Sequence, residues 1–134
     1  MRVTARRREG FTHDVDIEGG HTIVADEPTD AGGADQGASP TRLLAASLAA
    51  CTAITVEMYA ERKGWDVGAM EVDVDTTYEG YAPVRFDVTL RPTGELSGEQ
   101  MAKLRVIAGK CPVHKALTGD VTITIVEEPL RPEV

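Results

Sequence analysis

Two cysteines, Cys51 and Cys111, are the side chains of this sequence with the most varied reaction chemistry. A cysteine thiolate is a nucleophile and a metal ligand, whereas a buried thiol often acts only as a small packing group. Cys51 follows a nearly uncharged stretch of small and apolar residues, where packing is the ordinary role of an isolated cysteine. A reactive Cys51 would need a cation from another element, because a helix dipole acts mainly within the first turn.

Cys111 stands directly before Pro112, at the position expected for the N-cap of a short helix that runs to Leu117. Unpaired backbone N–H groups at a helix start stabilise a thiolate, and Lys110 and Lys115 add positive charge nearby. The sequence therefore predicts a lowered pKa for Cys111. A thiol of low pKa leaves easily in thiol–disulfide exchange, which suits a resolving cysteine but does not decide which cysteine meets a substrate first.

Histidine offers a second kind of chemistry, since His114 follows Cys111 at the spacing of a C-x-x-H metal hook. Zinc sites usually combine two such short-spaced pairs, whereas Cys51, His13 and His21 are scattered along this chain. We therefore expect neither a metal nor another cofactor. His114 is interpreted as a histidine on a solvated helix face.

Arg6, Arg7 and Arg8 form a basic cluster at the end of the first expected strand. Side chains alternate across a strand, so Arg6 and Arg8 share one face and Arg7 lies on the other. Two interpretations stay open: the charges protect a sheet edge from aggregation, or one guanidinium enters the core and holds a thiolate. Arginine suits the second role because it stays charged when buried.

The elements that would position these residues follow from hydrophobic periodicity and from turn and capping residues. Strands are expected at residues 3–8, 11–17, 21–25, 70–78, 84–91 and 121–126. Helices are expected at residues 39–64, 97–108 and 111–117. The polar, glycine-rich residues 30–38 are interpreted as a loop. Ser39 and Pro40 are favoured residues at the start of a helix, and Gly64 is favoured at its end.

This order of elements predicts an α+β fold with mainly antiparallel strands, since the short link at Gly80 favours a hairpin. The length suits a single domain covering residues 1–134. The long helix is nearly free of charge from Leu43 to Val56, which is typical of a helix buried on most sides. One short sheet covers such a helix poorly, so we expect a homodimer whose subunits pack their central helices together.

Composition and charge exclude several classes of partner. The net charge is −8, whereas binding to a nucleic-acid backbone needs a surplus of Lys and Arg. The N-terminus lacks the apolar stretch of a signal peptide, and we expect no segment that approaches the roughly 20 apolar residues of a transmembrane helix. These features predict a cytoplasmic protein that binds neither nucleic acid nor a membrane. In that reducing compartment two cysteines are seldom a structural disulfide.

Two segments resemble the OsmC/Ohr family, named for osmotically inducible protein C and organic hydroperoxide resistance protein. Residues 39–51, Ser-Pro-Thr-Arg-Leu-Leu-Ala-Ala-Ser-Leu-Ala-Ala-Cys, resemble the family's helix, which has a proline-containing start and a run of small residues ending in cysteine. Residues 111–117, Cys-Pro-Val-His-Lys-Ala-Leu, resemble its second signature. The separation of 60 residues between the cysteines also matches, and the resemblance covers nearly the whole chain.

The resemblance implies an OsmC-like fold, in which antiparallel sheets wrap around central helices in an intertwined homodimer with active sites at the subunit interface. It also implies a peroxidase that reduces organic hydroperoxides or hydrogen peroxide. Cys51 would attack the O–O bond as a thiolate, become a sulfenic acid and form a disulfide with Cys111. A thiol reductant, either a dithiol or a protein of the thioredoxin or lipoyl type, would then reset the enzyme. The family's thiolate-holding arginine matches Arg8 best, with Arg6 and Arg7 as alternatives.

One position departs from the family pattern. Family members commonly carry a glutamate one or two residues after the helix-start proline, paired with that arginine, and this chain has Thr41 and Arg42 there. Arg42 could repel the family's arginine or replace it. A second function therefore stays open, namely a non-catalytic member that binds a small apolar or electrophilic ligand at the dimer interface.

Overall fold

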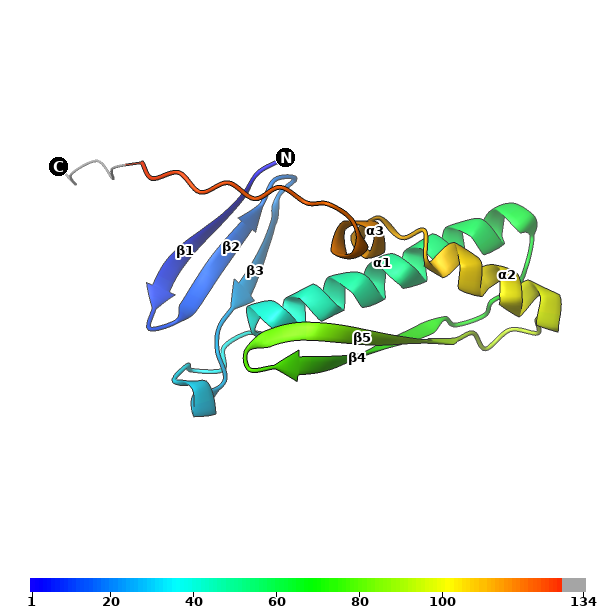
Figure 1. Ribbon diagram of the computed structural model, residues 1–134, viewed down its shortest axis with the longest axis horizontal. Helices are drawn as coiled ribbons and strands as arrows, with labels where there is room; N and C mark the ends of the chain where they lie inside the picture. Colours follow the sequence, from blue (N-terminus) through cyan, green and yellow to red (C-terminus); the bar gives the residue numbers. More distant parts are fainter. Residues whose placement is uncertain (129–134) are drawn as a thin grey trace.

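The computed structural model describes residues 1–128, so residues 129–134, which include Pro129 and Pro132, lie outside the described part. Up to residue 128 the chain forms an N-terminal sheet, a long helix, a β-hairpin and two shorter helices (Figure 1). The elements are β1 Val3–Glu9, β2 Thr12–Ile17, β3 His21–Ala25, the 3-10 turn η1 Thr29–Ala31, α1 Pro40–Lys63, β4 Glu71–Glu79, β5 Ala82–Arg91, α2 Gly98–Ala108 and α3 Pro112–Thr118. The predicted α+β class with antiparallel strands is confirmed.

The N-terminal sheet is antiparallel, with β1, β2 and β3 in sequence order. Its register aligns Ala5, Val15 and Ile23 across the three strands, so one face of the sheet is apolar. The opposite face is charged, because Arg6 on β1 forms an ion pair with Asp16 on β2. Such a two-faced sheet is built to bury one side and to expose the other.

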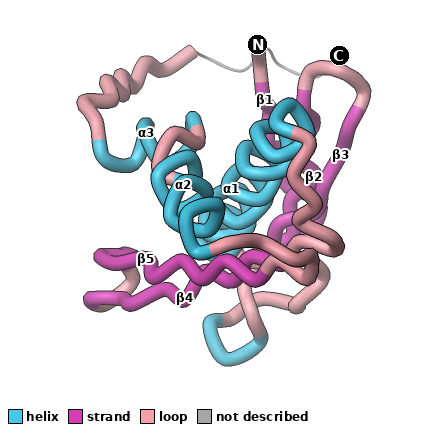
Figure 2. Tube along the Cα trace, turned by 90° about the vertical axis from the view of Figure 1, so that its right-hand side faces the viewer, coloured by secondary structure: helices cyan, strands magenta, loops and turns pink. Residues whose placement is uncertain are grey.

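The second sheet is the β4–β5 hairpin, which turns at Gly80 as predicted. Val74 lies opposite Val88 and Val72 lies opposite Leu90, so apolar side chains line one face. The hairpin packs against α1, and Figure 2 shows it running along one side of that helix. The site described below lies on this α1–hairpin layer.

Helix α1 begins at Pro40 after the N-cap residue Ser39 and ends before Gly64, whose φ of +70° is left-handed. These are the predicted start and end. The predicted burial on most sides is not reached within one chain, because only one stripe, consisting of Leu48, Thr52, Val56 and Ala60, is buried. Ile54 and Met58 are 51% and 59% exposed. The face of α1 that carries Ile54 and Met58 is largely uncovered within residues 1–128.

The core centres on the second half of α1, where Val56 and Ala60 pack against Leu104 of α2. Tyr59 and Trp65 pack on this cluster and meet edge to face, with ring centroids 5.6 Å apart. Aromatic pairs favour this geometry because the positive ring edge faces the negative ring face. The core therefore fixes α1 to α2 at the end of α1 remote from Ser39.

Residues 121–126 were expected to form a final strand, and this expectation is wrong for the single chain. The segment leaves α3 as extended chain, and no strand among residues 1–128 pairs with it (Figure 1). Its side chains Val121, Ile123 and Ile125 are 60%, 82% and 94% exposed. A strand needs a neighbouring backbone for its hydrogen bonds, and the alternating sequence alone cannot supply one.

The expectation that no segment approaches a transmembrane helix is also wrong, since α1 is long and apolar enough to cross a membrane by length and composition. A helix in the core of a water-soluble protein can meet the same criteria. The buried stripe of α1 and its packing against the hairpin and α2 fit that second explanation.

Candidate functional site

Cys51 and Cys111 meet where α3 packs against α1, although 60 residues separate them in the sequence. Both are free thiols, and their side chains lie close enough for each to shift the pKa of the other. Cys51 is half-buried, whereas Cys111 is completely buried. The fold thus forms a pair of adjacent thiols of which Cys51 is the more accessible.

Cys111 is the N-cap residue of α3, as predicted from Pro112, and its sulfur accepts a hydrogen bond from the His114 backbone N–H at 3.4 Å. Burial opposes ionisation of this thiol. Hydrogen bonds from Cys51, from the backbone N–H groups of His114 and Val113, and from Thr52 outweigh burial and lower the pKa of Cys111. The predicted acidity of Cys111 is confirmed in direction.

The pKa of Cys51 is shifted in the opposite direction from that of Cys111. Burial raises the pKa of the Cys51 thiol, and the hydrogen bond with Cys111 and its negative charge raise it further. The backbone N–H of Val113 and the hydroxyl of Thr55 act in the other direction without reversing the shift. Within one chain Cys111 is therefore the more acidic member of the pair, and Cys51 loses its proton less readily.

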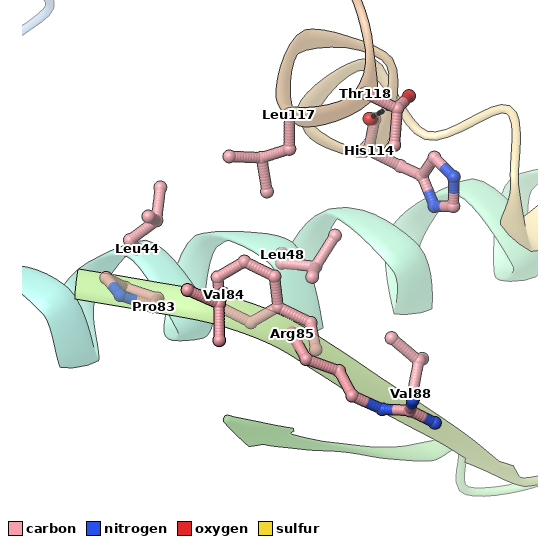
Figure 3. Close-up of a pocket in the computed structure, with 10 residues that line it drawn as sticks. Leu44, Leu48, Pro83, Val84, Arg85, Val88, His114, Leu117 and Thr118 are labelled. Carbon is pink, nitrogen blue, oxygen red and sulfur yellow. Dashed lines mark hydrogen bonds between the residues drawn. The ribbon is translucent and has the colours of Figure 1, made fainter. Parts of the chain in front are cut away.

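An apolar cavity of about 400 Å³ lies between α1, β5 and α3, one helical turn from Cys51. Its walls are formed by Leu44, Leu48, Pro83, Val84, Arg85, Phe86, Val88, His114, Leu117 and Thr118. Figure 3 shows Leu117 and His114 extending from α3 over Leu44 and Leu48 of α1. Leu48 shares its helix face with Cys51, because residues three apart are neighbours on a helix. A small apolar molecule in this cavity would lie beside the thiol pair.

Arg8, predicted to hold the Cys51 thiolate, lies on β1 and pairs with Asp14, with Nε 3.2 Å from Oδ2. That ion pair is on the charged face of the N-terminal sheet, which Arg8 shares with Arg6. Arg7 lies on the apolar face, opposite His13, and its Nε donates to the Gly10 carbonyl at 2.8 Å. Among the described elements this sheet has no extensive contact with α1 or α3, so the single chain does not bring these arginines to the cysteines.

Thr41 and Arg42, which replace the family's glutamate at the start of α1, differ in their surroundings. Thr41 is half-buried, and its hydroxyl lies 3.2 Å from the Tyr78 hydroxyl on β4. Arg42 is exposed. The first turn of α1 therefore ties the helix to the hairpin through neutral groups and carries no carboxylate.

Two features of the site were missed by the sequence analysis. His114 was interpreted as a solvated histidine, but it is half-buried and forms part of the cavity wall. Its position three residues after the N-cap, one turn along α3, was the available signal. The backbone N–H of Val113, which acts on both sulfurs, could not be identified without knowing that α3 packs against α1. In residues 1–128 no group of three or more His, Cys, Asp or Glu side chains is arranged to hold a metal.

Comparison with known proteins identifies relatives over most of the chain. The sequence profile of the family described as OsmC-like protein matches residues 32–126. An OsmC-like protein from Mycoplasma pneumoniae superimposes with a TM-score of 0.75 at 20% identity, covering 88% of this chain and 86% of that one. A search of curated proteins finds no match.

Two further solved structures share the fold. An organic hydroperoxide resistance protein OsmC from Legionella pneumophila has a TM-score of 0.62 at 22% identity, with 89% of this chain and 90% of that chain covered. An organic hydroperoxide resistance protein from Elizabethkingia anophelis has a TM-score of 0.64 at 22% identity, with 90% of both chains covered. At these identities the likeness establishes the fold, and the predicted OsmC-like arrangement of two small antiparallel sheets and helices is confirmed.

Proposed function

This chain belongs to the OsmC-like protein family, and we propose that it is a thiol-dependent peroxidase for organic hydroperoxides or hydrogen peroxide. The observation that carries the proposal is the contact between Cys51 and Cys111, beside an apolar cavity. Adjacent thiols of unequal accessibility and acidity are what a disulfide-forming redox cycle requires. The names of the structural relatives from Legionella and Elizabethkingia, both hydroperoxide resistance proteins, support the same chemistry.

In the proposed cycle the Cys51 thiolate attacks the distal oxygen of the peroxide RO–OH. An S–O bond forms and the O–O bond breaks, so the sulfur is oxidised by two electrons, the peroxide is reduced to ROH and Cys51 becomes a sulfenic acid. The Cys111 thiolate then attacks the Cys51 sulfur. An S–S bond forms, the S–O bond breaks and the hydroxyl leaves as water after taking up a proton. A dithiol reductant, of the thioredoxin or lipoyl type, returns two electrons and restores both thiols.

Accessibility favours Cys51 as the residue that meets the peroxide. Cys51 is half-buried and lies next to Leu48 of the cavity, whereas Cys111 is completely buried behind it. The acidity of Cys111 fits the second step, since a lowered pKa increases the thiolate fraction that can attack the sulfenic acid. It also makes Cys111 the better leaving group when the reductant attacks Cys51.

The thiolate of Cys51 still needs a positive charge, which we assign to the N-terminal sheet of a second copy. Arg8 was the expected residue, and its guanidinium is engaged with Asp14 on the charged face. Arg7 lies on the apolar face with Ala5 and Val15, which is the face suited to packing on another subunit. We therefore place Arg7 ahead of Arg8 in the proposed site, and Arg7→Ala should slow thiol oxidation more than Arg8→Ala.

A homodimer follows from the same reasoning, because α1 exposes Ile54 and Met58 and the extended C-terminal segment exposes Ile123 and Ile125. Apolar surface of this extent is ordinarily covered by a partner. The proposed protein is one OsmC-like domain, residues 1–134, that works in the cytoplasm as an intertwined dimer. Its OsmC-like fold is a soluble one, and the apolar helix α1 serves as the dimer's core rather than as a membrane span.

The proposal is tested by titrating thiols in the reduced protein before and after addition of cumene hydroperoxide. We expect the wild type to lose both thiols and to gain an intramolecular disulfide. Cys51→Ser should not turn over, and Cys111→Ser should accumulate a sulfenic acid at Cys51 that a dimedone reagent traps. Unchanged thiols in the wild type would refute a peroxidase. Trapping at Cys111 in Cys51→Ser would reverse the two roles.

A second function is favoured by the first turn of α1, where Thr41 and Arg42 stand in place of the family's glutamate, and by the nearby cavity, whose walls are mainly apolar. The chain would then bind a small apolar or electrophilic ligand beside the thiols without turnover. A fluorescent apolar probe that binds with equal affinity to wild type and to a Cys51→Ser, Cys111→Ser double variant, in a protein whose thiols resist peroxide, would support this function.

A further inference from the structure

We propose that His114 is the proton relay of the peroxide-reducing step, taking the proton of the Cys51 thiol and delivering it to the alkoxide that leaves when the O–O bond breaks. This inference rests on the proposed peroxidase function and adds a residue to it. It explains how a thiol that ionises with difficulty can react with an oxidant whose leaving group is a strong base.

The position of His114 supports this role. The backbone N–H of Val113 lies close enough to the Cys51 sulfur to lower the pKa of that thiol, so the residue before His114 is near the attacking atom. The His114 side chain lines the cavity together with Leu48, which lies one turn before Cys51 on the same helix face. Figure 3 shows the imidazole at the end of the cavity where α3 meets α1. A peroxide bound in the cavity would therefore lie against the His114 side chain, about one helical turn from Cys51.

Two other polar side chains in the cavity wall are less suited to carry a proton. Arg85 is paired with Asp87, with a nitrogen–oxygen distance of 2.9 Å, and a guanidinium is not deprotonated in proteins. The Thr118 hydroxyl donates to the His114 carbonyl oxygen at 2.9 Å. The ring of His114 forms no hydrogen bond with any side chain or backbone group of residues 1–128, so its nitrogens can serve a substrate. Imidazole both accepts and donates a proton near neutral pH.

The relay balances the first half of the cycle. His114 takes the thiol proton as Cys51 becomes a thiolate, the thiolate takes the terminal oxygen of RO–OH, and the imidazolium gives its proton to RO⁻. The net change is one thiol and one hydroperoxide converted to a sulfenic acid and an alcohol. The imidazole returns to its starting state and is ready for the next turnover.

The test compares two oxidants that differ in leaving group. tert-Butyl hydroperoxide releases an alkoxide, a strong base that needs a proton, whereas peracetic acid releases acetate, a weak base that does not. The rate of thiol loss is measured in wild type, in His114→Gln and in Arg105→Gln, a control at an exposed residue of α2. We expect His114→Gln to slow the reaction with tert-butyl hydroperoxide by about 10²-fold or more, the usual range for a general acid or base, because the alkoxide then leaves without a proton donor. The reaction with peracetic acid should slow by about threefold or less, because buffer can take the Cys51 proton before the attack and the acetate needs none.

A structural role for His114 predicts a different pattern. If His114→Gln slows both oxidants equally, or slows neither, the relay is refuted. His114→Ala gives a second measurement, because added imidazole should restore its rate with tert-butyl hydroperoxide but leave its rate with peracetic acid unchanged; failure of that rescue also refutes the relay. A wild type that reacts with neither oxidant would instead refute the proposed peroxidase function.

Discussion

At the scale of single residues, the two sulfurs differ in acidity because they occupy opposite ends of one hydrogen bond. The Cys51 thiol donates to Cys111, which stabilises a negative charge on Cys111 and makes a second negative charge on Cys51 costly. This arrangement assigns the first proton lost to the buried sulfur. The lowered pKa favours Cys111 over Cys51 as the sulfur that carries the negative charge.

Single alanine substitutions should separate these contributions. Cys51→Ala removes a hydrogen-bond donor from Cys111, so the pKa of Cys111 should rise. Cys111→Ala removes the hydrogen-bond partner and neighbouring charge that disfavour ionisation of Cys51, so the pKa of Cys51 should fall. The ultraviolet absorbance of the thiolate, followed against pH, measures both shifts. A Cys111 pKa that does not rise in Cys51→Ala, or a Cys51 pKa that does not fall in Cys111→Ala, would contradict the assigned polarity.

Asp26 is a buried carboxylate outside the site, and it organises the loop between β3 and α1. It accepts hydrogen bonds from the Thr12 hydroxyl at 2.7 Å and from the backbone N–H groups of Glu27 and Gln36 at 2.7 and 3.1 Å. Only 2% of its surface is exposed. The hydrogen bond from Thr12, followed by those from the backbone, holds the pKa of Asp26 below its ordinary value.

The sign of the pH dependence follows from that lowered pKa. The stabilisation is fully present above the unfolded-state pKa, about 3.9, and is lost as the pH falls through the folded-state value. Asp26→Asn should lower the unfolding midpoint at neutral pH by about 4 °C or more and should weaken the loss of stability on acidification. Thermal unfolding of wild type and variant between neutral and acidic pH measures both effects. Parallel curves for the two proteins would show that Asp26 is not the group responsible.

At the scale of elements, the starts and ends of the helices were predictable because they depend on nearby residues. Helix α2 shows this clearly: Ser97 accepts from the Gln100 backbone N–H at 3.1 Å, and the Gln100 side chain accepts from the Ser97 N–H at 2.8 Å. Ser97→Ala breaks this reciprocal cap and should destabilise the protein by about 1 kcal/mol. Chemical denaturation measures the loss, and the titration of the two cysteines should stay unchanged because α2 contributes neither sulfur. A change in that titration would mean that α2 supports the thiol pair.

Features that depend on distant residues were only partly predictable from the sequence. The residue types of Cys51 and Cys111 indicated redox chemistry, but local sequence could not show that α3 packs against α1 and joins the two sulfurs. For the same reason His114 was assigned to solvent, since its cavity is built from three elements. The predicted strand at residues 121–126 was wrong for the same reason. The alternating pattern indicates a segment that can form a strand, but it does not show whether a neighbouring strand is available to pair with it.

At the scale of the whole molecule, the structure has apolar surface on several elements that a single chain leaves uncovered. The exposed side of α1, the apolar face of the N-terminal sheet and the extended C-terminal segment all belong to this surface. A cavity of about 470 Å³ separates that sheet from the start of α1 and is lined by Val15, Ile23 and Leu43 among others. In the proposed dimer, an intertwined second copy would cover all of these surfaces. The apolar side of α1 would then be buried between the two subunits.

The dimer is tested by placing a charge on the uncovered side of α1. Ile54 is 51% exposed in the single chain, so in a monomer Ile54→Glu should cost almost nothing, whereas in the proposed dimer it would bury an unpaired carboxylate. We expect this variant to weaken dimerisation by about tenfold or more and to slow thiol oxidation, because the arginine of the second copy would be withdrawn from Cys51. Val106→Glu on α2 is the matched control, since Val106 is 57% exposed and lies on a helix outside the site. Sedimentation velocity and the rate of thiol loss measure the two effects; a wild type that sediments as a monomer, or an Ile54→Glu variant that is monomeric yet reacts at the wild-type rate, would show that the site is complete within one chain.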